Sequence, residues 1–246
     1  MKLRLSLLAA LCAASLSTAA AAHSGWSYTG DDGPEHWGNL SPAYATCQSG
    51  KNQSPVDLAA GSATAVNRTA FRYGPMNYSV ENNGHTIQAT PAEANQSLKL
   101  GGKTFTFKQF HFHTPSEHTF DGKYFPMEAH FVHQSDSGEL AVLGVMFVEG
   151  KENPALKPLL AQPLKAGEKA ELADKLDIMP MFPRGQKHYR LNGSLTTPPC
   201  SEGVNWIVFK HPVSASKAQL EAMRAMIGHD NNRPVQPLNA RIVVEE

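Results

Sequence analysis

The sequence predicts a mainly β protein, of the β-rich α+β class, with few helices. The first observation is a series of short runs that alternate apolar and polar residues or are rich in β-branched residues. The second is that turn signals such as Asp121-Gly122 and Ser137-Gly138 separate these runs. The third is the scarcity of helical periodicity. The predicted strands cover residues 104–113, 128–133, 140–148, 187–195 and 204–211.

Helical patterns occur in few places. The predicted helices cover residues 154–160, 168–176 and 216–227. The last is the best supported, because Ser216 and Gln219 have the spacing of a capping box and Gly228 is a stop signal. Its apolar residues share one face, so we expect this helix to cover the sheet.

The first 22 residues have the features of a secretory signal peptide. Lys2 and Arg4 give a positive start, an apolar run follows over residues 5–16, and small residues lie at the end. The run is too short to span a membrane, which takes about 20 apolar residues. We therefore expect cleavage after residue 22, a periplasmic or secreted product, and one mature domain over residues 23–246.

The mature chain is nearly neutral. The full sequence has 22 basic and 22 acidic residues, and Lys2 and Arg4 leave with the signal peptide. No basic run remains, which argues against nucleic acid and anionic membranes as partners. A chain of about 224 residues lies within the range of single all-β domains, so no second domain is required.

The cysteines indicate a disulfide. Cys12 leaves with the signal peptide, whereas Cys47 and Cys200 remain in a chain bound for an oxidising compartment. An even count there predicts a bridge between them. Closing a loop of this length stabilises the fold by up to about 4 to 5 kcal/mol in the chain-entropy model. Two separate buried thiols are the alternative.

The predicted strand at residues 104–113 carries two histidines on one face. Successive side chains of a strand point to opposite faces, so Gln109, His111 and His113 lie together. On the strand at residues 128–133 a third histidine, His130, shares a face with a glutamate and a valine. The short connection between these strands favours antiparallel pairing, which brings the third imidazole to the other two.

Three histidines on adjacent strands match catalytic zinc sites, in which three ligands leave an open position for water. An all-nitrogen site suits zinc, although cobalt or copper could replace it in vitro. Gln109 and Glu128 each precede a histidine by two residues, where they could accept a hydrogen bond from its second ring nitrogen. Ordinary sheet histidines are one alternative. A cupin-type site with Glu117 as a ligand is another, but the later cupin motif is not recognisable.

From Trp26 almost to the C-terminus, the sequence resembles the α-class carbonic anhydrases. The short Ala-rich signal and the cysteine pair make the bacterial, periplasmic branch the nearest likeness. The matching segments are Gly33-Pro34-Glu35-His36-Trp37, Asn52-Gln53-Ser54-Pro55-Val56, Asn83-Gly84-His85, residues 109–117, residues 128–133, Gly193-Ser194-Leu195-Thr196-Thr197-Pro198-Pro199, Trp206-Ile207-Val208 and Arg233-Pro234-Val235-Gln236-Pro237-Leu238.

The resemblance implies a large, mostly antiparallel, twisted central sheet with a few peripheral helices and a metal in a conical cleft. It implies one zinc ion per chain, held by His111, His113 and His130. The implied reaction is the reversible hydration of carbon dioxide to bicarbonate by a zinc-bound hydroxide. A catalytically silent carbonic-anhydrase-like binding domain is the alternative, but such relatives typically lack one or more of these histidines.

The same resemblance assigns roles around the zinc. Thr196 would accept a hydrogen bond from the zinc hydroxide and donate one to Glu117, and Thr197 would help to hold the substrate. The backbone carbonyl of Asn231 would orient His113. The match also gives Gln53 a supporting position.

Further roles concern the proton and the substrate. His85 matches the proton shuttle of the family, and imidazole suits that task because it titrates near neutrality. Residues implied to order water between the zinc and His85 are Tyr28, Asn83 and Gln88. Residues implied to form the apolar wall for the substrate are Val132, Val142, Leu195, Val204 and Trp206. Asn232 departs from the aromatic residue often found at its position, and a homodimer would be in keeping with bacterial relatives.

Overall fold

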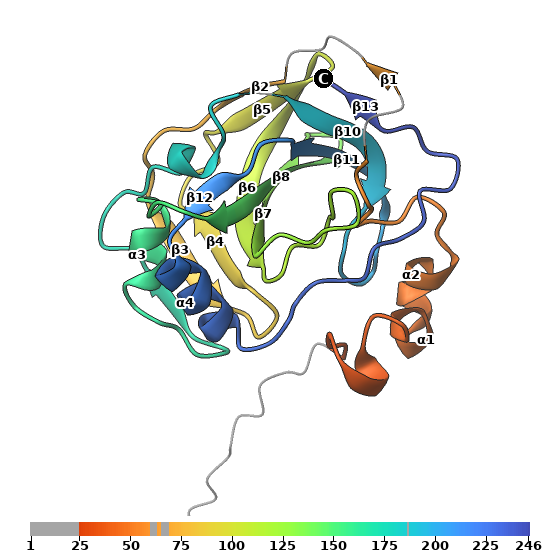
Figure 1. The fold of residues 1–246 in the computed structure, drawn as a ribbon, viewed down its shortest axis with the longest axis horizontal. Coiled ribbons are helices and arrows are strands. Elements are labelled where there is room, and N and C mark those ends of the chain that lie inside the picture. Colours follow the sequence, from red (N-terminus) through yellow and green to blue (C-terminus); the bar gives the residue numbers. More distant parts are fainter. Residues whose placement is uncertain (1–24, 60–62, 65–68, 186) are drawn as a thin grey trace, which may run out of the picture.

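The computed structural model describes residues 25–59, 63–64, 69–185 and 187–246, and the expected signal peptide lies outside them. One 13-stranded sheet dominates this part of the chain (Figure 1). Its main path runs β1-β13-β10-β11-β8-β7-β6-β4-β3-β9, with β12 beside β8, and with β5 between β2 and β6. The strands are β1 (Ala63–Thr64), β2 (Ala70–Arg72), β3 (Tyr78–Asn82), β4 (Ile87–Pro91), β5 (Ser97–Leu100), β6 (Lys103–His113), β7 (Met127–Gln134), β8 (Leu140–Glu149), β9 (Lys169–Glu171), β10 (His188–Ser194), β11 (Glu202–Phe209), β12 (Val213–Ala215) and β13 (Val244–Glu245).

Most neighbouring strands are antiparallel. The parallel pairs are β1 with β13, and β8 with both β11 and β12. The predicted mainly β fold with a mostly antiparallel sheet is therefore confirmed. All of the strands predicted from alternation occur, with ends shifted by no more than two residues.

Short helices surround the sheet. The α-helices of the described residues are α1 (Trp37–Leu40), α2 (Thr46–Ser49), α3 (Leu156–Leu160) and α4 (Lys217–Ile227), and the 3-10 turns are Gly30–Asp32, Pro42–Tyr44 and Met179–Met181. In Figure 1, α1 and α2 lie on the opposite side of the molecule from α3 and α4. None of the described helices is long and apolar enough to cross a membrane.

Helix α4 begins and ends as the sequence predicts. The Ser216 hydroxyl accepts a hydrogen bond from the backbone N–H of Gln219 at 3.2 Å, and the Ser216 N–H donates to the Gln219 side chain at 3.1 Å. Gly228 follows the helix with a φ of 85°, a left-handed conformation that glycine adopts without strain.

The helix predicted at residues 168–176 is wrong. Lys169–Glu171 instead form the edge strand β9, in which Ala170 lies opposite Val80 of β3. A helix this short is marginal in water by itself. The edge of β3 offers unpaired main-chain groups, so pairing with the sheet overrides the local helical pattern.

A β-bulge in β6 determines which side chains face the main core. The pairing register with β7 shifts between Phe107 and Gln109, which leaves Lys108 without an opposite residue. Without the bulge, Phe107 would lie on the same face as His111. With it, Phe107 and Phe110 both pack in the main core, and the histidines occupy the other face.

A disulfide joins Cys47 of α2 to Cys200, and their Cα atoms are 4.9 Å apart. The predicted pairing is therefore confirmed. Both half-cystines are buried in a small cluster with Trp37, on which Trp26 and Tyr28 also pack. The bridge fastens the N-terminal segment to the turn that follows β10.

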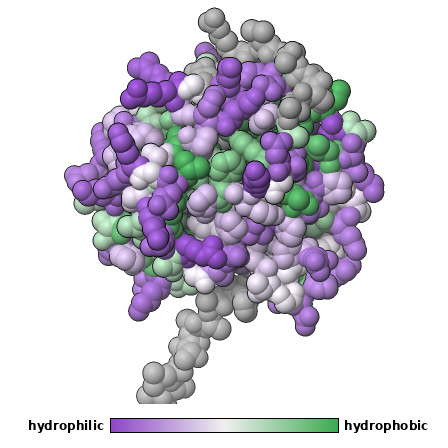
Figure 2. Space-filling model, viewed as in Figure 1, coloured by the Kyte–Doolittle hydropathy of each residue, from purple (hydrophilic) through white to green (hydrophobic). Residues whose placement is uncertain are grey.

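The molecular surface is mostly polar on the face seen in Figure 2, with hydrophobic residues near its middle. Large hydrophobic side chains exposed on the described residues are Tyr124, Met179, Val235 and Ile242. The homodimer stays a prediction.

We expect the Cys47→Ser/Cys200→Ser double variant to be less stable than the native chain by up to about 4 to 5 kcal/mol. The physical reason is the large separation of the half-cystines, 153 residues, whose closure restricts the unfolded chain. Urea unfolding of the two proteins measures the difference. Equal free energies of unfolding would show that the bridge does not act in this way.

A buried histidine outside the metal centre couples stability to pH. His133 of β7 donates from Nδ1 to the Phe131 carbonyl at 2.9 Å, and its Nε2 lies 2.6 Å from the hydroxyl of Tyr73. Because Nδ1 carries the hydrogen, Nε2 accepts from the hydroxyl, and the ring is neutral. Burial lowers the pKa of His133 to about 4, although hydrogen bonds to backbone carbonyls oppose the shift.

Protonation of His133 should therefore favour unfolding. The unfolded imidazole titrates near pH 6.5 and the folded one near 4, so the stability from the neutral ring is lost as pH falls through that window. The full loss is about 3 kcal/mol. Urea unfolding of wild type and His133→Gln between pH 7 and pH 4 tests this, since the variant should show the weaker pH dependence. Identical pH dependence in the two proteins would contradict the assignment.

Candidate metal centre

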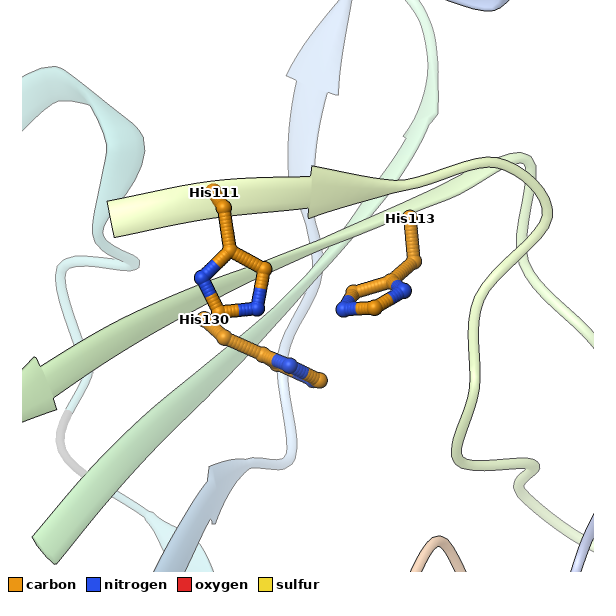
Figure 3. Close-up of side chains that lie close together, drawn as sticks. All are labelled: His111, His113 and His130. Atoms are coloured by element: carbon orange, nitrogen blue, oxygen red, sulfur yellow. The ribbon is translucent and has the colours of Figure 1, made fainter. Parts of the chain in front are cut away.

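Three imidazoles converge from two neighbouring strands (Figure 3). His111 and His113 project from one face of β6, and His130 projects from β7, directly opposite His111 in the pairing register. Each can present one nitrogen such that all three nitrogens lie within 4.8 Å of one another. The predicted antiparallel pairing therefore brings the three histidines together.

Hydrogen bonds fix which ring nitrogen of each histidine points to the centre. His111 Nδ1 lies 2.8 Å from Gln109 Oε1, and His113 Nδ1 lies 2.7 Å from the Asn231 carbonyl oxygen. His130 differs, because its Nε2 lies 2.8 Å from Glu128 Oε1. Each of these oxygens accepts an N–H. The lone pairs left for a metal are therefore on His111 Nε2, His113 Nε2 and His130 Nδ1.

Two buried atoms at the centre lack hydrogen-bond partners among the described residues, namely His113 Nε2 and Glu117 Oε2. They lie 3.5 Å apart, and the same carboxylate oxygen is 3.9 Å from His130 Nδ1. Leaving such atoms buried and unpaired is costly. A divalent cation held by neutral imidazoles would satisfy the orphaned nitrogen, so this donor set fits zinc.

The surroundings of the metal centre favour the neutral form of two of the three imidazoles, those of His111 and His113. Burial lowers the pKa of His111 and of His113, and the neighbouring rings lower both further. Burial acts in the same direction on His130, but the charge of Glu128 and its hydrogen bond outweigh this and raise the pKa of that ring. His130 therefore holds a proton more readily than His111 or His113 does, and metal binding must displace that proton.

Glu128 is the most heavily hydrogen-bonded carboxylate of the site. Its Oε1 accepts from His130 Nε2 and from His118 Nδ1, both at 2.8 Å. Its Oε2 accepts from the backbone N–H groups of Glu117 at 2.8 Å and His118 at 2.9 Å. Burial would raise the pKa of Glu128, but the two histidines and these bonds hold it well below its usual range. Gly144 makes room, because a Cβ there would lie 3.1 Å from Glu128 Oε1.

Strand alternation did not predict a role for His118. This fully buried ring packs edge-on against Trp206 at 4.7 Å between centroids and belongs to a second cluster with Glu128 and His130. The cluster is an extension of the metal centre, since both histidines share one oxygen of the glutamate. The pattern of strand alternation ends before this residue, which lies in the connection between β6 and β7.

Glu117 is held at one oxygen and open at the other. Its Oε1 accepts the backbone N–H of Arg233 at 2.8 Å, whereas Oε2 is the unpartnered atom beside the imidazoles. Thr196, the residue implied to donate to this oxygen, is buried. The structure does not form that hydrogen bond.

The loop that carries Thr196 is fastened by two serines. The backbone N–H of Ser54 donates to Ser194 Oγ at 2.9 Å, and that of Ser194 donates to Ser54 Oγ at 3.2 Å. The indole of Trp206 donates to the Ser194 carbonyl at 3.0 Å. Gly193 allows this close approach, because a Cβ there would lie 2.2 Å from Ser54 Oγ.

The buried Arg233 links the disulfide to the metal centre. Its guanidinium donates to Gln53 Oε1 at 2.9 Å and to the carbonyls of Ser54 and Cys47, each at 2.8 Å. Gln53 in turn donates to the Cys200 carbonyl at 3.1 Å, in keeping with its implied supporting position. The sequence match included Arg233, but its contacts could not be derived from spacing.

The residues implied in proton transfer belong to the N-terminal segment, to the turn after β3 and to strand β4. His85 stacks on Trp26, with ring centroids 3.9 Å apart, and lies 6.4 Å from the ring of Tyr28. Asn83 turns its side-chain oxygen to the N–H of His85 at 3.0 Å, so it shapes the turn. Gln88, which pairs with His111, donates to Glu81 at 3.0 Å. Burial raises the pKa of Tyr28 well above its usual value, and the charge of Glu117 adds to this rise.

The residues implied to form the apolar wall belong to one hydrophobic cluster. Val142, Val204 and Trp206 are buried in it, and Val132 and Leu195 pack against it with partial exposure. Thr197 lies two residues after Leu195 in the sequence. Its carbonyl accepts a hydrogen bond from the Cys200 N–H at 2.8 Å. Trp206 of this cluster packs edge-on against His130, with ring centroids 4.8 Å apart, so the wall borders the metal centre.

Fold and site together define a mainly β protein with a centre of three histidines that could hold a metal ion. The comparisons agree. Residues 32–246 match the sequence profile of the eukaryotic-type carbonic anhydrase family. A carbonic anhydrase of Neisseria gonorrhoeae is 46% identical over 95% of this chain and 93% of its own length. One of Klebsiella pneumoniae is 45% identical over 96% and 97%.

Solved structures give the same result. The α-carbonic anhydrase of Thermovibrio ammonificans, in complex with the inhibitor sulfanilamide, is 50% identical with a TM-score of 0.87, covering 89% of this chain and 98% of that one. Dioscorin complexed with ascorbate is 30% identical with a TM-score of 0.83, over 89% and 97%. The chain belongs to the α-carbonic anhydrase family, and it is an enzyme of that family that acts on carbon dioxide and bicarbonate.

We expect Glu128→Gln to weaken zinc binding by about 10- to 100-fold, as outer partners of metal ligands generally do. The amide would remove the charge that His130 faces and would oppose N–H donors with an N–H of its own. Zinc affinity is measured by competition with a chelator, with the exposed Glu139→Gln as the matched control. Equal affinities of both variants and the native protein would contradict this role.

Proposed function

We propose that the chain catalyses the reversible hydration of carbon dioxide with one zinc ion held by His111, His113 and His130. The observation that carries the proposal is the set of acceptors that turns one lone pair of each ring to a common centre. In carbonic anhydrases, bound zinc lowers the pKa of its water to about 7 and so supplies a nucleophile at neutral pH.

Glu117 and Thr196 would select and orient the nucleophile. Since Arg233 occupies Oε1 of Glu117, the free Oε2 is available to accept the Thr196 hydroxyl hydrogen. A threonine oxygen that donates in one direction can only accept in the other. It therefore admits a group that carries a hydrogen, and it turns the lone pair of that group towards carbon dioxide. The Thr197 side of the loop would hold the substrate.

His85 would carry the released proton to solvent. Its partial exposure to solvent and its imidazole chemistry support this role. Tyr28, Asn83 and Gln88 would order the intervening water. The apolar cluster with Val142 and Trp206 would accept the small linear substrate.

The alternative, a catalytically silent binding domain, is not favoured. The fold alone does not decide between the two, because dioscorin, the protein crystallised with ascorbate, shares it. The decision rests on the site, where all three histidines and their acceptors are in place.

We also propose that the enzyme is exported to the periplasm or secreted after cleavage of residues 1–22. The disulfide supports this, since such bridges persist in oxidising compartments.

The native protein should contain one zinc per chain and hydrate carbon dioxide, and His111→Ala should lose both properties. Removing one of the three ligands leaves a site too poor in donors for a dication. Metal analysis and stopped-flow hydration on both proteins give the test, with exposed His211→Ala as the matched control.

Sulfanilamide provides a second readout on the same proteins. It is the inhibitor bound to the Thermovibrio enzyme, and it should abolish the activity at one equivalent per zinc. The proposal fails if the zinc-loaded native protein hydrates carbon dioxide no faster than the His111→Ala variant.

A further inference from the structure

A second histidine, His229, lies against the turn that carries His85. His229 follows the C-terminal stop of α4, and its Nε2 lies 3.2 Å from the carbonyl oxygen of Gly84, the residue before His85. Its ring centroid is 5.8 Å from that of Tyr28. Nearby, Asn231 donates a side-chain N–H to the His85 carbonyl at 2.9 Å. Two separate contacts thus fasten the segment around His229 to the turn of His85.

The contacts of His229 suit a ring that gains and loses a proton. Its Nε2 faces the Gly84 carbonyl, and its Nδ1 lies 3.1 Å from the Asp230 carbonyl. Carbonyl oxygens only accept hydrogen bonds. A neutral imidazole has one N–H and satisfies one of them, whereas the imidazolium satisfies both. The ring is also half-exposed, so that a proton held there remains in exchange with solvent.

In the described part of the chain, the contacts of the His229 ring are with carbonyl oxygens and an aromatic ring and not with a carboxylate. Asp230 forms an ion pair with Arg224, so its carboxylate is engaged elsewhere. Tyr28, from the N-terminal segment, packs on the His229 ring and also contacts the ring of His85, from the turn between β3 and β4. Tyr28 contacts both imidazoles and keeps its proton, because burial and the Glu117 charge raise its pKa well above the usual value.

We propose that His229 is the second station of the proton path, receiving the proton from His85 and releasing it to buffer. This inference rests on the proposed function. Through solvent, the His85 imidazolium gives its proton to neutral His229 and returns to the neutral form. His229 then gives the proton to a buffer base, so each turnover exports one proton and leaves both rings neutral. The stacking of His85 on Trp26 confines that ring, which makes a separate, partly exposed acceptor useful.

The test compares His229→Gln with native protein in carbon dioxide hydration at low concentrations of a bulky, non-imidazole buffer. Glutamine keeps an N–H donor for the Gly84 carbonyl but does not titrate. We expect kcat to fall by about 2- to 10-fold, less than the roughly 100-fold or more expected of a direct general acid or base. The value of kcat/KM should stay unchanged, since it reports the conversion of carbon dioxide. The exposed His211→Gln serves as the matched control.

Two additional measurements separate a relay from a structural role. Imidazole buffer should restore kcat of His229→Gln, and an unchanged melting temperature would show that the turn is not distorted. Because the stations act in series, His85→Ala/His229→Gln should have the kcat of His85→Ala.

The outcomes are decisive. If His229→Gln behaves as His211→Gln does, or if the two losses multiply in the double variant, the series relay is overturned. If native protein lacks zinc-dependent hydration, the proposed function itself fails. A loss of kcat/KM in His229→Gln would assign the residue a structural role and would also overturn the relay.

Discussion

The site depends on a requirement that each metal-binding imidazole be held at its far nitrogen. An unheld ring can rotate and can present either nitrogen, so convergence of three lone pairs would be improbable. Here Gln109, Glu128 and the Asn231 carbonyl each accept one N–H and thereby choose the free nitrogen. Two of these acceptors lie on the strands that carry the histidines. The third arrives from a distant part of the chain, so the complete centre exists only in the folded protein.

Much of this centre could be predicted because it is local. The period of two along a strand places Gln109 and His111 on one face, and a short connection makes the next strand antiparallel. The remaining features depend on contacts between distant segments. Neither the bulge at Lys108 nor the pairing of β9 with β3 has a signal in the local pattern. The bulge nevertheless allows Phe107 to face the main core while His111, on the same strand, faces the metal centre.

Arg233 shows how remote segments determine the position of Glu117. Its backbone N–H binds the carboxylate, while its guanidinium is fastened to Gln53 and to the Cys47 carbonyl. Burial lowers the pKa of Arg233 to about 10, so that it stays charged at neutral pH. Its stacking over Trp37 adds a cation–π contact with a centroid distance of 5.6 Å. The disulfide, the tryptophan and the carboxylate are therefore parts of one packed unit.

The buried charges explain why a cation is suited to this centre. Glu117 and Glu128 are both fully buried. Glu128 is compensated by four N–H donors, but Glu117 has a single backbone donor, and the orphaned His113 nitrogen lies beside its second oxygen. Two carboxylates and the neutral rings of His111 and His113 leave a local excess of negative charge and of lone pairs. A dication offsets the negative charge and binds the lone pairs at the same time, whereas a proton on one ring would offset one charge and engage one lone pair. Metal binding should for this reason be coupled to folding, because the unfolded chain offers neither the ring orientation nor the buried carboxylates.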